Sequence, residues 1–254
     1  MLESVSSTND RLRRLASEGA HEGTVVLADH QSSGRGRMGR SWSSPAGLGV
    51  YFSVLLRPRE AEGEPTRWSL AAALAACEAC RELTGRAVEI KWPNDLLCGG
   101  KKLGGVLAEA RTQAGARTEL TLGIGINVLQ STADFTGELA ESATSLRLVA
   151  AGDPPERELV AAACLHELAG LAALMRRGEW SSVVRRFERW SPGTHGRRVR
   201  VETFHAEDGA RAYRGVTDGV APDGALRIRR EDGGIDTVRM AASVTDDRPE
   251  RDRR

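Results

Sequence analysis

The chain changes character at residues 191–196, where SPGTHG separates two kinds of sequence pattern. Before this point, stretches with apolar residues at helical spacing alternate with short apolar runs of the kind that form strands. After it, from Arg198 onward, the sequence consists of short alternating runs separated by Gly- and Asp-rich turns. The two patterns predict an α+β chain in which a sheet packed by helices is followed by a small all-β unit.

This change sets the expected boundaries. We expect a mixed sheet packed by helices over residues 1–192 and a small β-barrel over 195–244. Residues 245–254 mix opposite charges without an apolar anchor, so they predict a disordered tail. In the first part, periodicity predicts helices near 66–84, 155–177 and 179–190, and strands near 24–31, 47–58 and 118–129.

The overall charge does not indicate a polyanionic partner. The chain has 36 basic and 35 acidic residues and a net charge of +1, so any binding of anions has to be local. The sequence has no run near the roughly 18 apolar residues of a membrane span. Its first ten residues lack the basic and apolar regions of a secretory signal. We therefore expect a cytoplasmic protein without a membrane partner.

The metal-ligating residue types do not form a recognisable site in the sequence. Cys77, Cys80, Cys98 and Cys164 lack the paired spacing of zinc sites, and the five histidines form no HxxxH pair. We expect the cysteines to be buried free thiols in a reducing compartment, and we expect no protein-bound metal.

Residues 34–42, GRGRMGRSW, place positive charge in a segment too rich in glycine for a stable helix. The arginines are Arg35, Arg37 and Arg40, and the glycines are Gly34, Gly36 and Gly39. Guanidinium groups stay charged near neutral pH and bind oxyanions through forked hydrogen bonds, while glycine lets backbone N–H groups reach the same anion. The segment is a candidate anion-binding loop with Trp42 as an apolar cover. A solvated loop or an RNA-binding tract is the alternative.

A second cluster of polar residues lies in KWPNDLLCGGKKLGGVLAE, residues 91–109. The pair Gly99-Gly100 between two short apolar runs predicts a β-hairpin. Gly104 and Gly105 in its second strand would let a ligand lie against the backbone. Taken alone, the cluster is better explained by turn residues and a solvated lysine than by a binding site. Its polar members are Lys91, Asn94, Asp95 and Lys102.

Five motifs nevertheless occur in a specific order: SSTN from Ser6, the glycine–arginine segment, GLGVYFSVLLRP, KWPNDLLCGGKKLGGVLAE and GIGINV. In order and wording they resemble the biotin–protein ligases over about residues 6–128. The resemblance implies a biotin/lipoate ligase-like catalytic fold followed by an SH3-like barrel. It also implies that biotin and ATP form biotinyl-5′-AMP with release of pyrophosphate, and that biotin then passes to one lysine of a carrier protein. Because SSTN begins so early, we expect the monofunctional class without an N-terminal DNA-binding domain, and no DNA partner.

The resemblance assigns one group of residues to biotin. Ser, Thr, Asn and Gln side chains, at residues 7–9 and at Gln31, have the donors and acceptors that a cyclic urea requires. Residues 7–9 also fit helix capping. Trp42 is expected beside the acyl chain. The implied biotin-binding residues are Ser7, Thr8, Asn9, Gln31, Gly34, Arg35, Gly36, Arg37, Trp42, Lys102, Gly104 and Gly105.

A second group is assigned to the nucleotide and to catalysis. The biotin carboxylate and the α-phosphate repel each other at close range unless cations screen them. Arg37 and Lys102 are the implied catalytic cations, with Mg²⁺ carried on ATP. Asp95 is our hypothesis for the group that orients or accepts the proton of the acceptor lysine, whose reference pKa is about 10.4. The implied ATP- and adenylate-binding residues are Arg35, Arg37, Arg40, Lys91, Asn94, Lys102 and Asn127, the last of which is equally explained as a strand-end asparagine.

Two other functions fit parts of the sequence. A lipoate or octanoyl–protein ligase shares the fold, but its apolar ligand leaves the urea-binding residues without a purpose. A non-catalytic nucleic-acid-binding module would use C-terminal arginines, although only 4% of residues are aromatic and could stack on bases. These arginines are Arg198, Arg200, Arg227, Arg229 and Arg230. The family implies the biotin carboxyl carrier domain of acetyl-CoA or another acyl-CoA carboxylase as protein partner, and leaves a homodimer open.

Overall fold

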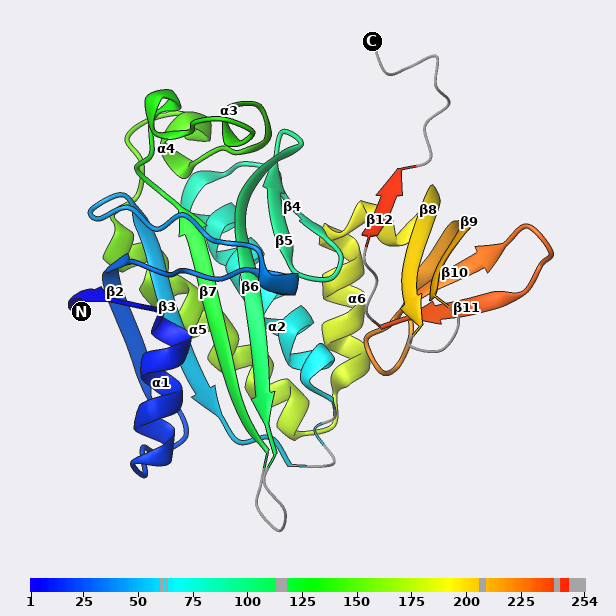
Figure 1. Ribbon diagram of the computed structural model, residues 1–254, viewed down its shortest axis with the longest axis horizontal. Helices are drawn as coiled ribbons and strands as arrows, with labels where there is room; N and C mark the ends of the chain where they lie inside the picture. The colour runs from blue at the N-terminus through cyan, green and yellow to red at the C-terminus, as the bar shows by residue number, and fades with distance from the viewer. Residues whose placement is uncertain (60–61, 63, 113–117, 206–208, 240–242, 247–254) are drawn as a thin grey trace.

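The computed structural model describes residues 1–59, 62, 64–112, 118–205, 209–239 and 243–246, which form two sheets and the helices around them (Figure 1). The larger sheet has seven strands in the order β1-β2-β3-β7-β6-β5-β4. β1 and β2 are parallel, and every other neighbouring pair is antiparallel. Its strands are β1 Leu2–Val5, β2 Val25–Gln31, β3 Gly49–Leu56, β4 Val88–Lys91, β5 Asp95–Cys98, β6 Lys101–Arg111 and β7 Glu119–Asn127.

One face of this sheet carries α1 (Thr8–Ser17). Leu12 and Ala16 lie one turn apart on the helix and pack against Val26 and Leu55 of the sheet. The C-terminal half of this short helix thus packs on the sheet through its apolar side chains. Its N-terminal turn carries polar side chains.

The opposite face carries the long helices (Figure 1). α2 (Pro65–Thr84) packs on β4, β6 and β7, α5 (Arg157–Arg176) packs on α2 and β3, and α6 (Trp180–Trp190) packs on α2. The predicted helices near 66–84, 155–177 and 179–190 are present, and glycines end the first two: Gly85 ends α2 at φ 65°, and Gly178, at φ 76°, separates α5 from α6. Among the described residues, α5 alone is long and apolar enough by composition to cross a membrane, yet it packs here against α2 and the sheet.

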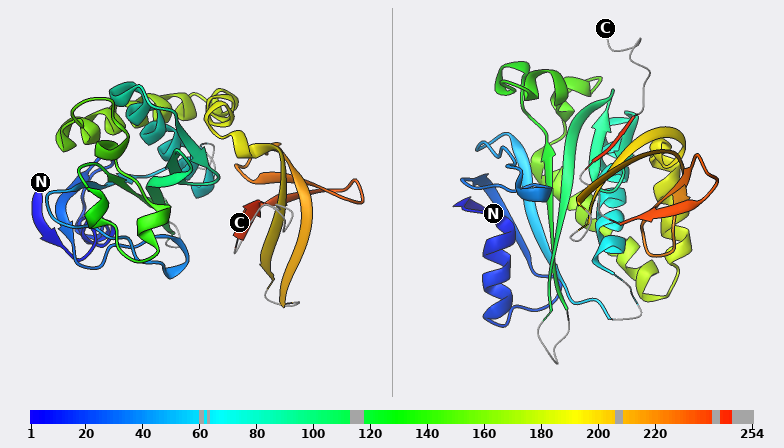
Figure 2. Two further views of the ribbon diagram at one scale, coloured as in Figure 1. Left: turned by 90° about the horizontal axis from the view of Figure 1, so that it is seen from above. Right: turned by 45° about the vertical axis from the view of Figure 1, so that its right-hand side comes forward.

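The second sheet has five antiparallel strands in the order β11-β10-β9-β8-β12 and stands beside α6 (Figure 2). Its strands are β8 His195–His205, β9 Gly209–Val220, β10 Leu226–Arg230, β11 Ile235–Val238 and β12 Ser243–Asp246. The predicted all-β unit is thus present, and its closure into an SH3-like barrel stays a prediction. The expected tail was placed two residues too early, because Thr245 and Asp246 belong to β12 and pair with β8. The rest of it, 247–254, lies outside the described residues.

The two sheets share a core and are tied by hydrogen bonds. Val201 and Ile228 of the second sheet belong to the same buried cluster as the α2 face of the first. Trp92 Nε1 donates to the carbonyl of Gly224 at 3.2 Å, and Ser191 Oγ donates to the carbonyl of Ile90 at 2.7 Å. The short elements are α3 Leu139–Ser142, α4 Leu146–Val149 and the 3₁₀ turns Arg37–Gly39, Thr132–Asp134 and Pro192–Thr194.

Candidate active site

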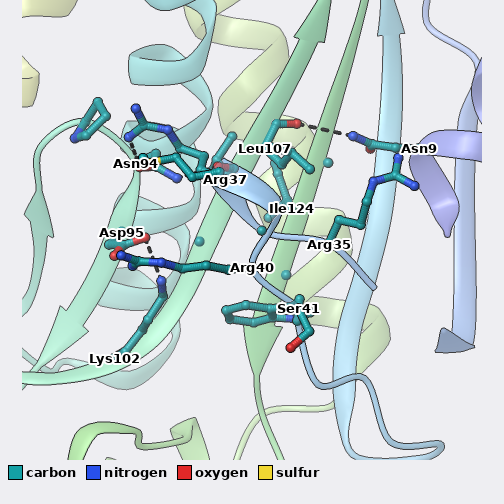
Figure 3. A pocket seen from close by; sticks show the side chains of 18 of the residues that line it. Asn9, Arg35, Arg37, Arg40, Ser41, Asn94, Asp95, Lys102, Leu107 and Ile124 are labelled. Atoms are coloured by element: carbon teal, nitrogen blue, oxygen red, sulfur yellow. Dashed lines mark hydrogen bonds and ion pairs between the residues drawn. The ribbon is translucent and has the colours of Figure 1, made fainter. Parts of the chain in front are cut away.

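A cavity of about 420 Å³ opens on the face of the seven-stranded sheet that α1 partly covers (Figure 3). Its lining comes from the first turn of α1, residues 34–42, the β4–β5 turn, β6, β7 and β12. We refer to residues 34–42 as the cationic strap. Most predicted site residues line this cavity: Ser7, Thr8, Asn9, Gln31, Arg35, Gly36, Arg37, Arg40, Trp42, Lys91, Asn94, Asp95, Lys102 and Gly105.

The floor of the cavity is formed by glycines at alternate positions of β7. Leu122 and Ile124 face the core, so Gly123 and Gly125 face the cavity. A Cβ atom at Gly123 would lie 2.5 Å from Asn9 Oδ1, and one at Gly125 would lie 2.6 Å from Trp42 Nε1. These side chains therefore rest directly on the strand backbone, which only glycine permits. We did not assign these two residues from the sequence, although the GxG spacing is their signal.

The two glycines of β6 have different surroundings. Gly105 pairs with Gly125 and lines the cavity, and a Cβ there would lie 3.4 Å from Asp95 Oδ1. Gly104 is not part of the lining. A Cβ on it would lie 2.7 Å from the carbonyl of Gly125 and 3.1 Å from Leu96. The structure thus explains Gly104 by close strand packing rather than by a ligand.

The first turn of α1 forms a neutral polar wall. Thr8 donates to Gln31 Oε1 through its backbone N–H at 2.8 Å and through its hydroxyl at 3.1 Å. Ser53 Oγ lies 2.6 Å from Asn9 Oδ1 and 2.8 Å from Thr8 Oγ1. Ser7 occupies the N-cap position, yet its side chain makes no capping hydrogen bond. Helix capping therefore explains the position of Ser7 but not its side chain, which faces the cavity.

The cationic strap is a closed hairpin. Gly36 N–H donates to the carbonyl of Arg40 at 2.7 Å, and Trp42 N–H donates to that of Gly34 at 2.8 Å. Met38 turns the tip at φ 57°, a conformation that is uncommon outside glycine. Gly34 lies outside the lining, and a Cβ on it would be 2.4 Å from the carbonyl oxygen of Trp42. Because Gly34 has no side chain, the two arms of the strap can approach closely enough to form the hairpin.

Two cationic side chains are supported from the β4–β6 region. Arg37 Nη1 donates to Asn94 Oδ1 at 3.0 Å, and Asn94 Nδ2 donates to the carbonyl of Val106 at 2.6 Å. Burial lowers the pKa of Arg37, but a guanidinium stays protonated at neutral pH. Lys102 Nζ lies 2.8 Å from Asp95 Oδ1 and 5.7 Å from the centre of the Trp42 ring. The Arg40 side chain points toward Asp95 (Figure 3).

Arg35 differs from the other strap arginines because carboxylates hold it. Its guanidinium donates to both oxygens of Asp10, at 2.5 and 2.7 Å, and lies 3.3 Å from Glu109 Oε2. The hydrogen bond from Arg35 holds the pKa of Asp10 below its usual value. Arg35 lines the cavity as predicted, but its charge is matched by protein groups. Asp10 and Glu109 were not assigned from the sequence.

Asn127 is not brought into the cavity. Its Nδ2 donates to the carbonyl of Thr144 at 2.9 Å, and its Oδ1 accepts from Gln130 Nε2 at 3.3 Å. Both ends of the amide are thus used within the protein, which supports the strand-end interpretation. Other lining residues that sequence reasoning missed are Met38, Ser41, Trp92, Pro93, Val106, Leu107, Ile124, Val244 and Thr245.

The remaining expectations concern groups outside the cavity. All four cysteines are buried free thiols. In the part of the chain that the structure describes, no three His, Cys, Asp or Glu side chains are grouped as a metal site. The C-terminal arginines meet acidic neighbours: Arg227 and Arg229 both pair with Asp218, and Arg230 pairs with Asp232. Such matched charges do not favour a nucleic-acid surface.

The chain has clear relatives. Residues 1–127 match the biotin/lipoate A/B protein ligase family. The chain is 43% identical over 153 residues to the bifunctional ligase/repressor BirA of Bacillus subtilis, covering 60% of this chain and 47% of that protein. It is 35% identical over 217 residues to the biotin–[acetyl-CoA-carboxylase] ligase of Mycobacterium tuberculosis, covering 84% and 77%. The chain spans about half the length of the first curated relatives it matches.

Solved structures agree with this assignment. The biotin protein ligase of Aquifex aeolicus in complex with biotin and ATP superposes with a TM-score of 0.80 at 30% identity, covering 96% of this chain and 97% of that one. Its match extends beyond residue 127 into the helices and the second sheet. From the ordered motifs, the shared architecture and the extent of these matches, the chain belongs to the biotin/lipoate A/B protein ligase family and is similar to its biotin protein ligases.

Proposed function

We propose that the chain is an ATP-dependent biotin–protein ligase, which forms biotinyl-5′-AMP and transfers biotin to a lysine of a carrier domain. The supporting observation is that one cavity joins a neutral polar end to a cationic end (Figure 3). Asn9, in the first turn of α1, lies at the neutral end, and Arg37 and Lys102 lie at the cationic end. A cyclic urea suits the first and two meeting anions suit the second.

In the first half-reaction, a carboxylate oxygen of biotin attacks the α-phosphorus of ATP. The bond from that phosphorus to the bridging oxygen breaks, and pyrophosphate leaves with the electron pair. Arg37 and Lys102 screen the two anions and stabilise the charge that develops on the phosphoryl oxygens. Asn94 holds Arg37 in place at 3.0 Å, so the cation is oriented before the ligands arrive.

Mg²⁺ fits this scheme as a companion of ATP, because the phosphates supply most of the oxygen ligands that it prefers. When bound, it would neutralise charge on the phosphates and on the departing pyrophosphate. The chain itself contributes the cations Arg37 and Lys102 to the same cavity.

In the second half-reaction, the acceptor lysine attacks the acyl carbon of the adenylate, and AMP leaves. The amine has to lose a proton, and Asp95 is the carboxylate of the cavity that we assign to orient or accept it. Lys102 has three N–H donors, so it can keep its hydrogen bond to Asp95 while it meets a ligand oxygen.

The test is incubation of the full chain with biotin, Mg·ATP and the biotin carrier domain of an acyl-CoA carboxylase. Mass spectrometry should show biotin on one lysine of the carrier, and the rate of this gain should fall about 100-fold or more in Arg37→Ala and in Lys102→Ala. Calorimetry with biotin and with lipoate separates the two ligases of this fold. Tight binding of lipoate without binding of biotin would refute the proposal.

A further inference from the structure

Four charged side chains from three parts of the chain meet beside Asn9, and their charges cancel. Asp10 and Arg13 come from α1, Arg35 from the cationic strap and Glu109 from β6. Arg35 is hydrogen-bonded to Asp10, and Arg13 pairs with both carboxylates, lying 3.2 Å from Glu109. Neither carboxylate takes part in the proposed reaction. Their charges balance those of the two arginines, so the cluster adds no net charge beside the cavity.

Glu109 has one further partner, which lines the cavity. Its Oε2 accepts a hydrogen bond of 2.6 Å from Nδ2 of Asn9. A carboxylate without a proton accepts hydrogen bonds and donates none, so this contact fixes the NH₂ group of Asn9 on the side of Glu109. The carbonyl of Leu107 lies on the same side, 3.5 Å from Nδ2. Both groups thus impose the same orientation on the amide.

The opposite end of the amide is therefore turned to the cavity floor. Asn9 Oδ1 accepts from Ser53 Oγ at 2.6 Å and lies against Gly123, where a Cβ would come within 2.5 Å of it. An amide oxygen accepts two hydrogen bonds, and Ser53 supplies one. The second acceptor position of Asn9 suits an N–H donor of a ligand in the cavity.

We propose that Glu109 is a positioning residue that sets ligand specificity: it holds the Asn9 amide so that its oxygen, not its NH₂ group, meets the ligand. The proposal rests on the proposed function, since the ligand donor is a urea N–H of biotin. Through Arg35, which also bonds to Asp10, Glu109 ties this orientation to the closed strap. A ligand without an N–H donor gains nothing from the arrangement.

Glu109→Gln tests the orientation without changing the size of the side chain. Glutamine presents either an oxygen or an NH₂ group, so only the longer contact of 3.5 Å with the Leu107 carbonyl still favours the original orientation of the Asn9 amide. Calorimetry would compare the full-length wild type and variant with biotin and with biotin methylated on both urea nitrogens. We expect E109Q to weaken biotin binding about tenfold and to leave the methylated ligand within about twofold, because the lost interaction is one hydrogen bond.

Two variants serve as controls. Glu119 also lies on a strand and pairs with an arginine, Arg57, at 2.9 Å. Neither glutamate lines the cavity, but Glu109 contacts the lining residue Asn9, whereas Arg57 lies outside the lining. E119Q should bind both ligands like the wild type. Asp10 contacts Arg35 but not Asn9, so D10N should leave the ratio of the two affinities unchanged while affecting both ligands alike.

The outcomes separate the possibilities. The proposal is supported if E109Q lowers the ratio of the affinity for biotin to that for methylated biotin, while E119Q and D10N leave this ratio unchanged. Equal weakening of both ligands by E109Q, or equal behaviour of E109Q and E119Q, would show that Glu109 only stabilises the fold and would overturn it. If the wild type does not bind biotin, the proposed function fails and this inference fails with it. The unfolding temperatures of E109Q and E119Q, compared with that of the wild type, show whether either substitution lowers the stability of the fold.

Discussion

Lys102 Nζ lies 2.8 Å from Asp95 Oδ1, so the ammonium group that faces the cavity is held by a carboxylate of the neighbouring strand. The two groups neutralise each other until an anion enters. The backbone of Lys102 is fixed as well, because its carbonyl accepts from the N–H of Thr144 at 2.9 Å. Lys102 is thus positioned from both its side chain and its main chain.

Removal of this ammonium should stop the first half-reaction. We expect Lys102→Ala to lower the rate of biotinyl-5′-AMP formation about 100-fold or more, the usual effect of removing one charge-stabilising donor. Pyrophosphate release measures it. Lys101 is the adjacent lysine of the same hairpin, is exposed and is absent from the cavity lining. Lys101→Ala should therefore react within about twofold of the wild type, and an equal loss in both variants would contradict the assignment.

Asp95 should matter most after the adenylate has formed. Asp95→Asn keeps an oxygen acceptor for Lys102 but cannot take a proton. Single-turnover transfer from pre-made biotinyl-5′-AMP to the carrier should slow about 100-fold, the scale of general base catalysis. Raising the pH should restore part of the rate, because the acceptor lysine then loses its proton to solvent. Transfer at the normal rate in the variant would exclude this role.

The bare backbone of β7 should be essential for ligand binding. In Gly125→Ala, the added Cβ would lie 2.6 Å from Trp42 Nε1, so the indole has to move and the cavity changes shape. We expect the dissociation constant for biotin, measured by calorimetry, to rise at least about tenfold. Gly152→Ala is the matched control, since a Cβ there has no neighbour within 4 Å. Unchanged binding in Gly125→Ala would mean that Trp42 does not shape the site.

The cysteines should be inert in the folded protein. Burial raises the pKa of Cys77, Cys80 and Cys98, and it raises the pKa of Cys164 to about 12. A thiol reagent needs the thiolate and access to it, so labelling with Ellman's reagent should be slow in buffer and should reach all four thiols in denaturant. Rapid labelling of the native protein would show that the core around α2 opens on the experimental timescale.

The sequence predicted local elements well because local signals specify them. The glycines that end α2 and turn the β5–β6 hairpin act through positive φ angles that other residues rarely adopt. The resemblance also assigned Ser7, Asn94 and Lys102 to one binding site, and in the structure these three residues line one cavity. The alternation in residues 47–58 predicted the strand, but all eight residues of β3 are buried because helices cover both faces of the sheet.

What the sequence did not reveal depends on pairing between distant segments. β3 lies next to β7, and Arg35 meets Glu109, 74 residues away, so neither contact has a local signal. Asn127 continues the alternate positions of β7 that face the cavity, but the carbonyl of Thr144 takes its amide. A polar side chain can bind a ligand only if groups elsewhere in the protein do not already take its hydrogen bonds, and such contacts have no signal in the local sequence.

Val244 and Thr245 of β12 form part of the cavity lining, although the rest of the lining lies within residues 7–125. During synthesis, the helices and the larger sheet leave the ribosome long before these two residues do. Until then, the strap, the glycines of β7 and the cations lack one wall of the cavity. The finished site depends on residues translated more than one hundred positions after its other parts.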